Sequence, residues 1–331
     1  MKITRKEIAM KIRKILCALT AATMICCSAS CGCVAQNPAE EGDATVTTTT
    51  TERTTETTTN ADTSVMDTTD EVTDDGIVTE RPETDDRIDK TEENEQTDEA
   101  AYASSYINIT KIGWGLGKEK NDKNQPLDAV NAQEKYKDSL FLTADGKICL
   151  TFDEGYENGH TAEILDVLKE KQVKAVFFVT YDYCRSSPDL VQRMIDEGHT
   201  VGNHSYTHPS FPDCSTDEMI EEIMVLHDYV AEKFGYEMDY FRFPKGEFSE
   251  KCLETVKSTG YKAVFWSFAY NDWDTKAQPD KGEALQKIKS STHSGIYLLH
   301  AVSETNAAIL GEVIDYWKSE GYEIGGGEML A

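Results

Sequence analysis

Basic residues are scarce in this chain. Only 33 lysine and arginine residues stand against 60 aspartate and glutamate residues among 331, which leaves a formal net charge of −27. Binding to the phosphate backbone of a nucleic acid needs surfaces rich in lysine and arginine. We therefore exclude nucleic acid as a partner.

Two further absences narrow the class of protein. After residue 33 the sequence contains no charge-free apolar run of 18 residues, so it is not a polytopic membrane protein. The cysteines of the C-terminal part form no C-x-x-C pair, which excludes zinc-knuckle and thioredoxin-like sites. Two arrangements are compatible with the four cysteines of this part: one or two disulfides, or scattered buried thiols. These cysteines are Cys149, Cys184, Cys214 and Cys252.

The charge is distributed unevenly and divides the chain into three parts. Residues 1–33 carry a net charge of +5, residues 34–100 carry −17, and residues 101–331 carry −15. The last part, of about 230 residues, is long enough to bury a large share of its surface. We expect a basic head, an acidic middle and one globular body.

The head has the pattern of a secretory signal. Six lysine and arginine residues precede an apolar stretch from residue 15 to about residue 27, and small residues follow. The sequence S-A-S-C-G resembles a bacterial lipoprotein box with Cys31 as the acylated residue, although Ser28 stands where leucine is usual. An uncleaved signal anchor is the alternative. We expect residues 1–33 to direct export to the outer face of the membrane or the cell wall, with a lipid or the signal itself as anchor.

Residues 34–105 are predicted to form a disordered linker. Threonine, aspartate and glutamate dominate this segment and aromatic residues are almost absent. Such a composition buries too little apolar surface to offset the entropy lost on ordering. A tether into a thick cell wall and a plain solubilising spacer both fit it.

The body, residues 106–331, alternates short apolar runs with amphipathic segments. Strands are predicted over 147–153, 173–180, 199–202, 240–243, 263–268, 295–299 and 322–324. Helices are predicted over 162–171, 188–197, 216–234, 249–259, 282–290 and 307–320. Apolar strands separated by helices are typical of a parallel sheet covered on both faces. About seven such units favour an α/β fold, a distorted (β/α)7 TIM-like barrel preceded by the linker.

Reactive side chains follow the predicted strands at their C-terminal ends, where barrel enzymes carry their chemistry. They are Asp153, Glu154, His204, His208, Arg242, Asp272, Trp273 and His300. The two histidines His204 and His208 are four residues apart, which places both imidazoles on one face of a helical turn. With a carboxylate they would bind zinc, manganese or cobalt. The ion would acidify a water, one carboxylate would deprotonate it, and another histidine would protonate the leaving group.

Five short motifs occur in order along the body: T-F-D-E-G at 151–155, H-S-Y-T-H at 204–208, R-F-P-K-G at 242–246, D-W at 272–273 and L-L-H at 298–300. With them, residues 147–326 resemble the polysaccharide deacetylase (NodB-homology, carbohydrate esterase family 4) domain. The longer first motif T-F-D-E-G-Y-E-N-G, with G-W-G at 113–115 and V-F-W-S-F at 264–268, resembles the delta-lactam-biosynthetic de-N-acetylases. That subgroup removes acetyl from muramic acid in peptidoglycan.

The resemblance implies a role for each motif residue. Asp153 is the general base, His204 and His208 bind the metal, and Arg242 holds the charge of Asp153. His300 is the general acid and is oriented by Asp272. Trp273 and Leu298 surround the acetyl methyl, and the backbone N–H of Lys245 lies at the oxyanion. Apart from the resemblance, we expect Tyr156 and Asn158, which follow the first motif, to contact the substrate.

Glu154 stands where most of the family has aspartate as the third metal ligand, so the resemblance implies Glu154 in that role. The added methylene leaves open whether its carboxylate reaches the ion. The sequence thus predicts a metal-dependent enzyme that removes N-acetyl groups from the peptidoglycan glycan strand, from muramic acid first of all. The alternatives are a deacetylase of N-acetylglucosamine or chitin, an esterase of O-acetyl xylan, and a non-catalytic wall-binding module.

Overall fold

The computed structural model of this chain describes residues 107–330. The predicted signal segment (1–33) with Cys31, and nearly all of the predicted linker (34–105), lie outside these residues, so both stay predictions. Within 107–330 no helix is long and apolar enough to cross a membrane. The four cysteines of the body are free thiols, and Cys214 alone among them is partly exposed.

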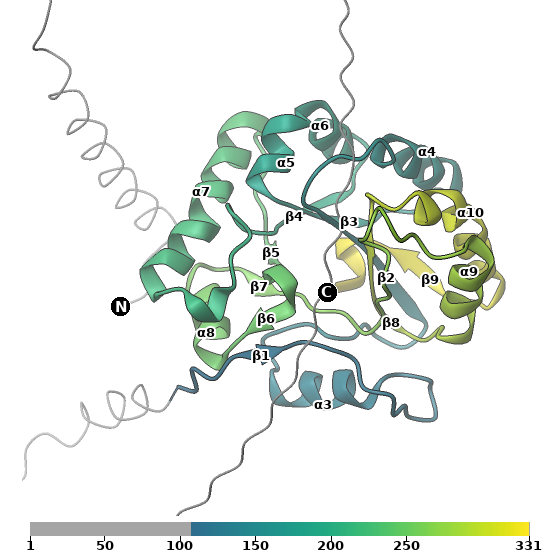
Figure 1. Cartoon of the computed structure of the whole chain (residues 1–331), viewed down its shortest axis with the longest axis horizontal. Helices are drawn as coiled ribbons and strands as arrows, with labels where there is room; N and C mark the ends of the chain where they lie inside the picture. The colour runs from purple at the N-terminus through teal and green to yellow at the C-terminus, as the bar shows by residue number, and fades with distance from the viewer. Residues whose placement is uncertain (1–106, 331) are drawn as a thin grey trace, which may run out of the picture.

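A seven-stranded parallel sheet lies at the centre of the body (Figure 1). Its strand order is β7-β5-β4-β3-β2-β8, and β9 pairs with the beginning of β2. The strands are β2 (Lys147–Glu154), β3 (Val176–Val179), β4 (Thr200–Asn203), β5 (Tyr240–Phe241), β7 (Lys262–Ala263), β8 (Gly295–His300) and β9 (Glu323–Gly325).

The two ends of this strand order meet through an irregular segment. Beyond β7 the chain continues to Phe268, which forms a parallel bridge with Tyr297 of β8. The backbone N–H of Leu298 donates a hydrogen bond of 2.9 Å to the Phe268 carbonyl. The sheet is therefore closed into a distorted barrel, which confirms the predicted fold. The strand predicted over 263–268 is regular only at its start.

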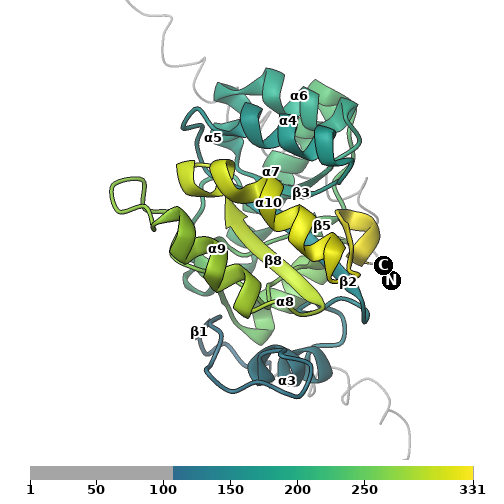
Figure 2. The ribbon, with the colours of Figure 1, turned by 90° about the vertical axis from the view of Figure 1, so that its right-hand side faces the viewer.

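Helices surround the barrel (Figures 1 and 2), and α10 packs between α4 and α9. They are α4 (Thr161–Lys171), α5 (Tyr181–Ser186), α6 (Pro188–Asp196), α7 (Thr216–Phe234), α8 (Glu250–Ser258), α9 (Lys281–Ser290) and α10 (Glu304–Ser319). Three features were not predicted from the sequence: α5, α3 (Leu127–Lys135), and the small antiparallel pair β1 (Ile112–Gly113) and β6 (Glu247–Phe248). Helix α3 and the pair lie beside the barrel (Figure 1). Short 3-10 turns are η1 (Phe211–Asp213), η2 (Pro244–Gly246) and η3 (Gly327–Leu330).

Helix α7 shows why the predicted helix boundaries are mostly accurate. Ser215 accepts a hydrogen bond from the backbone of Glu218, and the Glu218 side chain accepts one from the backbone of Ser215. This reciprocal cap satisfies N–H groups that have no partner inside a helix. The helix ends at Gly235, which has a left-handed backbone with φ of 65°.

Side chains alternate between two cores along the strands. On β2, Ile148, Leu150 and Phe152 pack against the helices, whereas Cys149 packs inside the barrel. The interior cluster is closed at one end by Met329 of η3. Because successive side chains of a strand point to opposite faces, the odd-numbered residues of β2 face the interior and the even-numbered residues face the helices. This alternation decides which motif residues can reach a site inside the barrel.

Candidate active site

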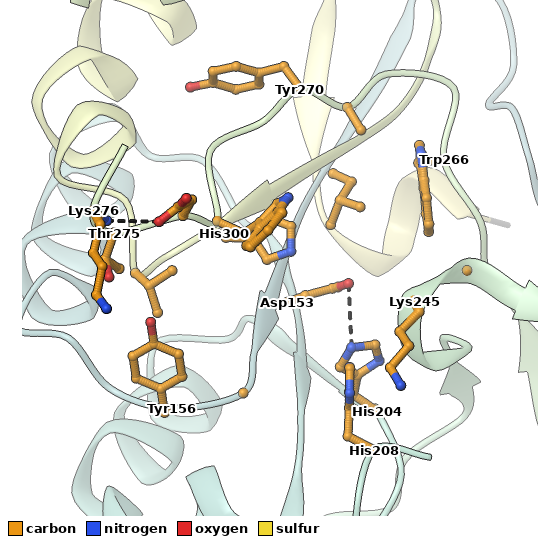
Figure 3. A pocket seen from close by; sticks show the side chains of 17 residues that line it. Asp153, Tyr156, His204, His208, Lys245, Trp266, Tyr270, Thr275, Lys276 and His300 are labelled. Carbon is orange, nitrogen blue, oxygen red and sulfur yellow. Dashed lines mark hydrogen bonds and ion pairs between the residues drawn. The ribbon is translucent and has the colours of Figure 1, made fainter. Parts of the chain in front are cut away.

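A cleft of about 1050 Å³ opens at the C-terminal ends of the strands (Figure 3). It is the end at which the sequence predicted the chemistry. Of the predicted site residues, those that line the cleft are Asp153, Tyr156, His204, His208, Lys245, Trp273, Leu298 and His300. Segments separated by almost 150 residues therefore contribute to one site.

Asp153, at the floor of the cleft, forms an ion pair with Arg242, which lies behind it. Arg242 Nη1 donates a hydrogen bond of 2.8 Å to Asp153 Oδ1, and the arginine side chain is fully buried. Burial alone would raise the pKa of Asp153, but the guanidinium of Arg242, with smaller contributions from His204 and His300, outweighs burial and holds that pKa below its ordinary value. Asp153 is thus an ionised carboxylate at the cleft surface.

The guanidinium of Arg242 is held on all sides. Nη1 also donates to Thr151 Oγ1 at 2.8 Å, while Nε and Nη2 donate to the carbonyls of Val264 and Phe265 at 3.2 Å. The ring of Phe178 lies 4.2 Å below its central carbon. A charge buried in this way needs each of these partners, because an unpaired buried charge is very costly. Arg242 therefore acts from behind Asp153.

His204 and His208 lie together at one side of the cleft, with ring centroids 4.8 Å apart. The predicted helical turn is wrong, because residues 204–208 form an irregular loop. Left-handed backbone at Ser205 (φ 73°) and at His208 (φ 60°) turns the chain back on itself. His204 Nδ1 lies 2.9 Å from the Arg242 carbonyl, so it carries the proton there and leaves Nε2 free.

The two imidazoles are suited to a divalent ion of the zinc, manganese or cobalt type. Burial lowers the pKa of His204, and burial with the neighbouring His204 lowers the pKa of His208 to about 4, so both rings are neutral near pH 7. Asp153 Oδ2 faces this pair, 3.6 Å from His204 Nε2 (Figure 3). Within residues 107–330 no three His, Cys, Asp or Glu side chains form a complete metal site by themselves.

Glu154, the implied third ligand, does not join this pair. It follows Asp153 on β2 and therefore faces the helices, on the side of Phe152. Its side chain is fully buried, and neither carboxyl oxygen has a hydrogen-bond partner within the described part of the chain. Burial first, then the charges of Glu157 and Asp153, raise the pKa of Glu154 well above its ordinary value. Here Glu154 is a buried acid outside the cleft, and burial favours its neutral form.

His300 and Asp272 form the second polar pair. His300 Nδ1 lies 2.8 Å from Asp272 Oδ1, and the His300 backbone N–H donates to Asp272 Oδ2 at 2.9 Å. Burial would lower the pKa of His300, but the hydrogen bond and the charge of Asp272 outweigh it, so that pKa lies above its ordinary value. His300 is on β8 directly beside Asp153 on β2, since the two are register partners. A proton donor and a proton acceptor thus share one cleft.

The predicted substrate contacts divide into three groups. Leu298 is almost buried in the cleft wall, whereas Tyr156 and Trp273 are 53% and 58% exposed and stand at its rim. Lys245 lines the cleft from the turn η2, where it adopts a left-handed backbone with φ of 58°. Asn158 does not line the cleft, because its side chain donates a hydrogen bond of 2.9 Å to the Val302 carbonyl and holds its own loop in place.

Among the residues that line the cleft but were not predicted from the sequence are Trp266, Tyr270 and Lys276. Trp266 falls inside the strand predicted over 263–268, and its largely buried side chain lines the cleft. The strand ends at Ala263, so the chain beyond it is free to turn Trp266 toward the cleft. Tyr270 and Lys276 lie in the loop before α9 and belong to no motif, so no pattern marked them.

Comparison with known proteins places these residues in a family. The polysaccharide deacetylase family model matches residues 143–264. The chain is 41% identical over 231 residues to the peptidoglycan-N-acetylmuramic acid deacetylase PdaA of Bacillus subtilis, spanning 67% of this chain and 86% of that protein. It is 34% identical over 178 residues to the peptidoglycan-N-acetylglucosamine deacetylase PgdA of Listeria monocytogenes, spanning 54% of this chain and 37% of that protein.

The folds agree as well. The structure of Bacillus subtilis PdaA, described as a family 4 carbohydrate esterase, superimposes with a TM-score of 0.63 at 37% identity. The match covers 67% of this chain and 97% of that one. The sequence identity, the length matched and the shared barrel lead to one conclusion: the chain belongs to the polysaccharide deacetylase family, carbohydrate esterase family 4.

Proposed function

We propose that this protein is a metal-dependent hydrolase that removes the N-acetyl group from N-acetylmuramic acid in peptidoglycan. The observation that carries the proposal is the placement of Asp153 and His300 side by side at one cleft, one held ionised by Arg242 and the other held protonated by Asp272. Hydrolysis of an amide needs both groups at once, because a base must activate water and an acid must protonate the leaving nitrogen.

The chemistry follows from these charges. Asp153 takes a proton from the water that attacks the acetyl carbonyl carbon, and His300 gives a proton to the amide nitrogen as the carbon–nitrogen bond breaks. The products are acetate and a free amine on the sugar. A divalent ion held by His204 and His208 would lower the pKa of the attacking water and polarise the acetyl carbonyl. The Lys245 backbone N–H would stabilise the negative oxygen of the tetrahedral intermediate.

Two observations support muramic acid as the sugar. The relative named for muramic acid, PdaA, is matched over most of its length at the higher identity, whereas PgdA is matched over 37% of its length. Muramic acid also differs from glucosamine by a lactyl ether that ends in a carboxylate when no peptide is attached. The cleft offers two lysines, Lys245 and Lys276, that can pair with such an anion.

The place of action is part of the proposal. The signal pattern of residues 1–33 supports export, and Cys31 would carry a lipid that holds the protein at the outer face of the membrane. Incorporation of labelled palmitate into the full-length chain tests this. We expect the wild-type chain to take up label and the Cys31→Ala chain to take up none. Label retained by Cys31→Ala would contradict a lipid at that residue.

The activity is tested by release of acetate from defined glycans. The protein, loaded with zinc, manganese or cobalt, is incubated with peptide-free glycan strands, with chitin oligosaccharides and with O-acetylated xylan. We expect mass spectrometry to show loss of acetyl from muramic acid. Asp153→Asn removes the base while keeping the shape of the side chain, so it should fold and lose about 100-fold to 10,000-fold in turnover.

Each alternative has its own outcome in this experiment. Reaction with chitin oligosaccharides or xylan but not with muramic acid would assign the same chemistry to a different sugar. No reaction with any glycan, no metal bound in calorimetric titration and retained affinity for glycan strands would together assign a wall-binding module and overturn the proposal.

A further inference from the structure

A chain of buried polar groups continues from the cleft beyond Asp272. Asn306, in the first turn of α10, is 1% exposed. Its Nδ2 donates a hydrogen bond of 2.6 Å to Asp272 Oδ2 and another of 3.1 Å to the His300 carbonyl. Its Oδ1 accepts a hydrogen bond from the hydroxyl of Tyr270. Since both atoms facing Nδ2 are acceptors, only one orientation of this amide satisfies the network.

Asp272 requires such partners because it is fully buried. A buried carboxylate is stable only when donors surround it. The N–H of the His300 backbone and the amide of Asn306 both occupy Oδ2, which leaves Oδ1 for the imidazole of His300. The plane of the carboxylate is thereby fixed. In turn it fixes His300 with a proton on Nδ1, and Nε2 is the ring nitrogen left for the substrate.

The beginning of α10 is built to hold Asn306 at this point. Ser303 caps the helix by accepting a hydrogen bond of 3.1 Å from the backbone of Asn306. The Ser303 hydroxyl also donates to Gln278 Oε1 at 2.6 Å, and Gln278 Nε2 donates to the backbone carbonyl of Asp272 at 2.9 Å. The cap, the loop that carries Asp272 and the amide therefore form one unit.

Tyr270 brings the network back to the cleft, whose wall it lines (Figure 3). Burial, followed by the charge of Asp272, raises the pKa of Tyr270, so the phenol is neutral and can donate its proton to Asn306. One residue at the surface of the cleft is thus linked through Asn306 to the carboxylate that orients the acid.

We propose that Asn306 and Tyr270 are positioning residues for His300: they hold Asp272 in the one orientation that keeps the imidazole Nε2 directed into the cleft. This inference rests on the proposed function, in which His300 protonates the leaving amine. Asn306 does not line the cleft, and the hydroxyl of Tyr270 is directed to Asn306. Their effect is on turnover, because binding of the glycan in its ground state does not depend on the direction of His300 Nε2.

The test compares Asn306→Ala and Tyr270→Phe with a matched control, Thr305→Val. Thr305 lies beside Asn306 on α10, is equally buried, and donates a hydrogen bond of 2.8 Å to the Pro279 carbonyl outside the cleft. We expect kcat on peptide-free glycan to fall by about tenfold to a hundredfold in Asn306→Ala and by a smaller factor in Tyr270→Phe. KM should stay within about twofold, and Thr305→Val should keep the wild-type kcat.

A second readout does not depend on activity. Nitrogen-15 NMR of the imidazole, at a pH high enough for His300 to be neutral, reports which ring nitrogen carries the proton. The wild type should show the proton on Nδ1, and Asn306→Ala a mixture. A kcat that falls in Thr305→Val as in Asn306→Ala, or an unchanged tautomer, would overturn the inference and assign a structural role. If Asn306→Ala does not fold, Tyr270→Phe decides by the same two readouts.

The two proposals can fail separately. A wild-type protein that releases no acetate, but whose imidazole loses its single tautomer in Asn306→Ala, overturns the proposed function and supports the positioning role. An active wild type whose turnover and tautomer are the same in all three variants overturns the positioning role alone.

Discussion

Arg242 Nη1 and Asp153 Oδ1 are 2.8 Å apart, and the arginine of this pair is completely buried inside the barrel. The carboxylate has one oxygen toward Arg242 and the other toward His204. The carboxylate at the end of β2 is thus kept ionised by a guanidinium that does not itself line the cleft. The charge of Asp153 is therefore set from behind the cleft.

Removal of Arg242 should be costly for the fold. In Arg242→Met the carboxylate of Asp153 stays buried without its partner, and breaking a buried pair from one side costs about 3–5 kcal/mol. Denaturant unfolding measures the loss. The control is Arg185→Met, which breaks the exposed pair of Arg185 with Asp182 on α5 and should change little. Equal losses in the two variants would contradict the importance of burial.

The pH dependence of turnover should reflect two shifted groups. Asp153 must be ionised, and its pKa lies below the ordinary 3.8, so protonation of Asp153 itself should lower activity only below that pH. His300 must be protonated, and its pKa lies above the ordinary 6.5, so activity should persist above pH 6.5 and fall as His300 loses its proton. Asp272→Asn should move this basic limb to lower pH. A basic limb that does not move would show that another group is the acid.

The raised pKa of His300 should also make the stability of the fold decrease as pH rises. A histidine whose pKa is raised by folding contributes stability that is fully present below its unfolded value and is lost as pH rises through its folded value. The free energy of unfolding should therefore decline on the basic side of pH 6.5. Urea unfolding across this range measures the decline, which should be smaller in Asp272→Asn because the group that raises the pKa is gone. The same decline in both proteins would assign it to other groups.

Metal binding should depend on the histidine pair and not on Glu154. Calorimetric titration with zinc, manganese and cobalt should show binding to the wild type and its loss in His208→Ala. A chelator should lower turnover by about a hundredfold or more, reversibly. Glu154→Gln is the matched variant: since Glu154 faces the helices, metal affinity should be unchanged. A large drop in affinity in Glu154→Gln would make Glu154 a ligand, as the family resemblance implies.

Selection for muramic acid should depend on the charge of Lys245. Lys245→Asn removes the charge, and asparagine tolerates the left-handed backbone found there. Loss of one charge-assisted contact of about 1.5 kcal/mol should lower the preference for peptide-free muramic acid over N-acetylglucosamine by about tenfold in kcat/KM. Lys137→Asn, outside the cleft, is the control. An unchanged preference would rule out Lys245 as the partner of the carboxylate.

Much of the site could be read from the sequence because its parts are local. Apolar strands of fixed period, each followed by a polar motif, place the ends of parallel strands at one edge of the barrel. Asp153, Arg242 and His300 were therefore predictable as a group before any contact was known. The limits of α7 were predictable too, since a cap and a terminal glycine act within a few residues.

Other features depend on packing between distant segments, and only the tertiary structure decided them. Glu154 faces the helices because β2 remains a regular strand through that residue. A motif alone does not show at which residue the side chains of a strand stop alternating between its two faces. His204 and His208 meet through left-handed residues and not through a helical turn. Asn306 reaches Asp272 because α10 begins beside a loop 34 residues earlier. A sequence by itself determines the hydrophobic periodicity of strands and helices and the capping of helix ends. The contact of two buried polar groups depends on how every element between them packs.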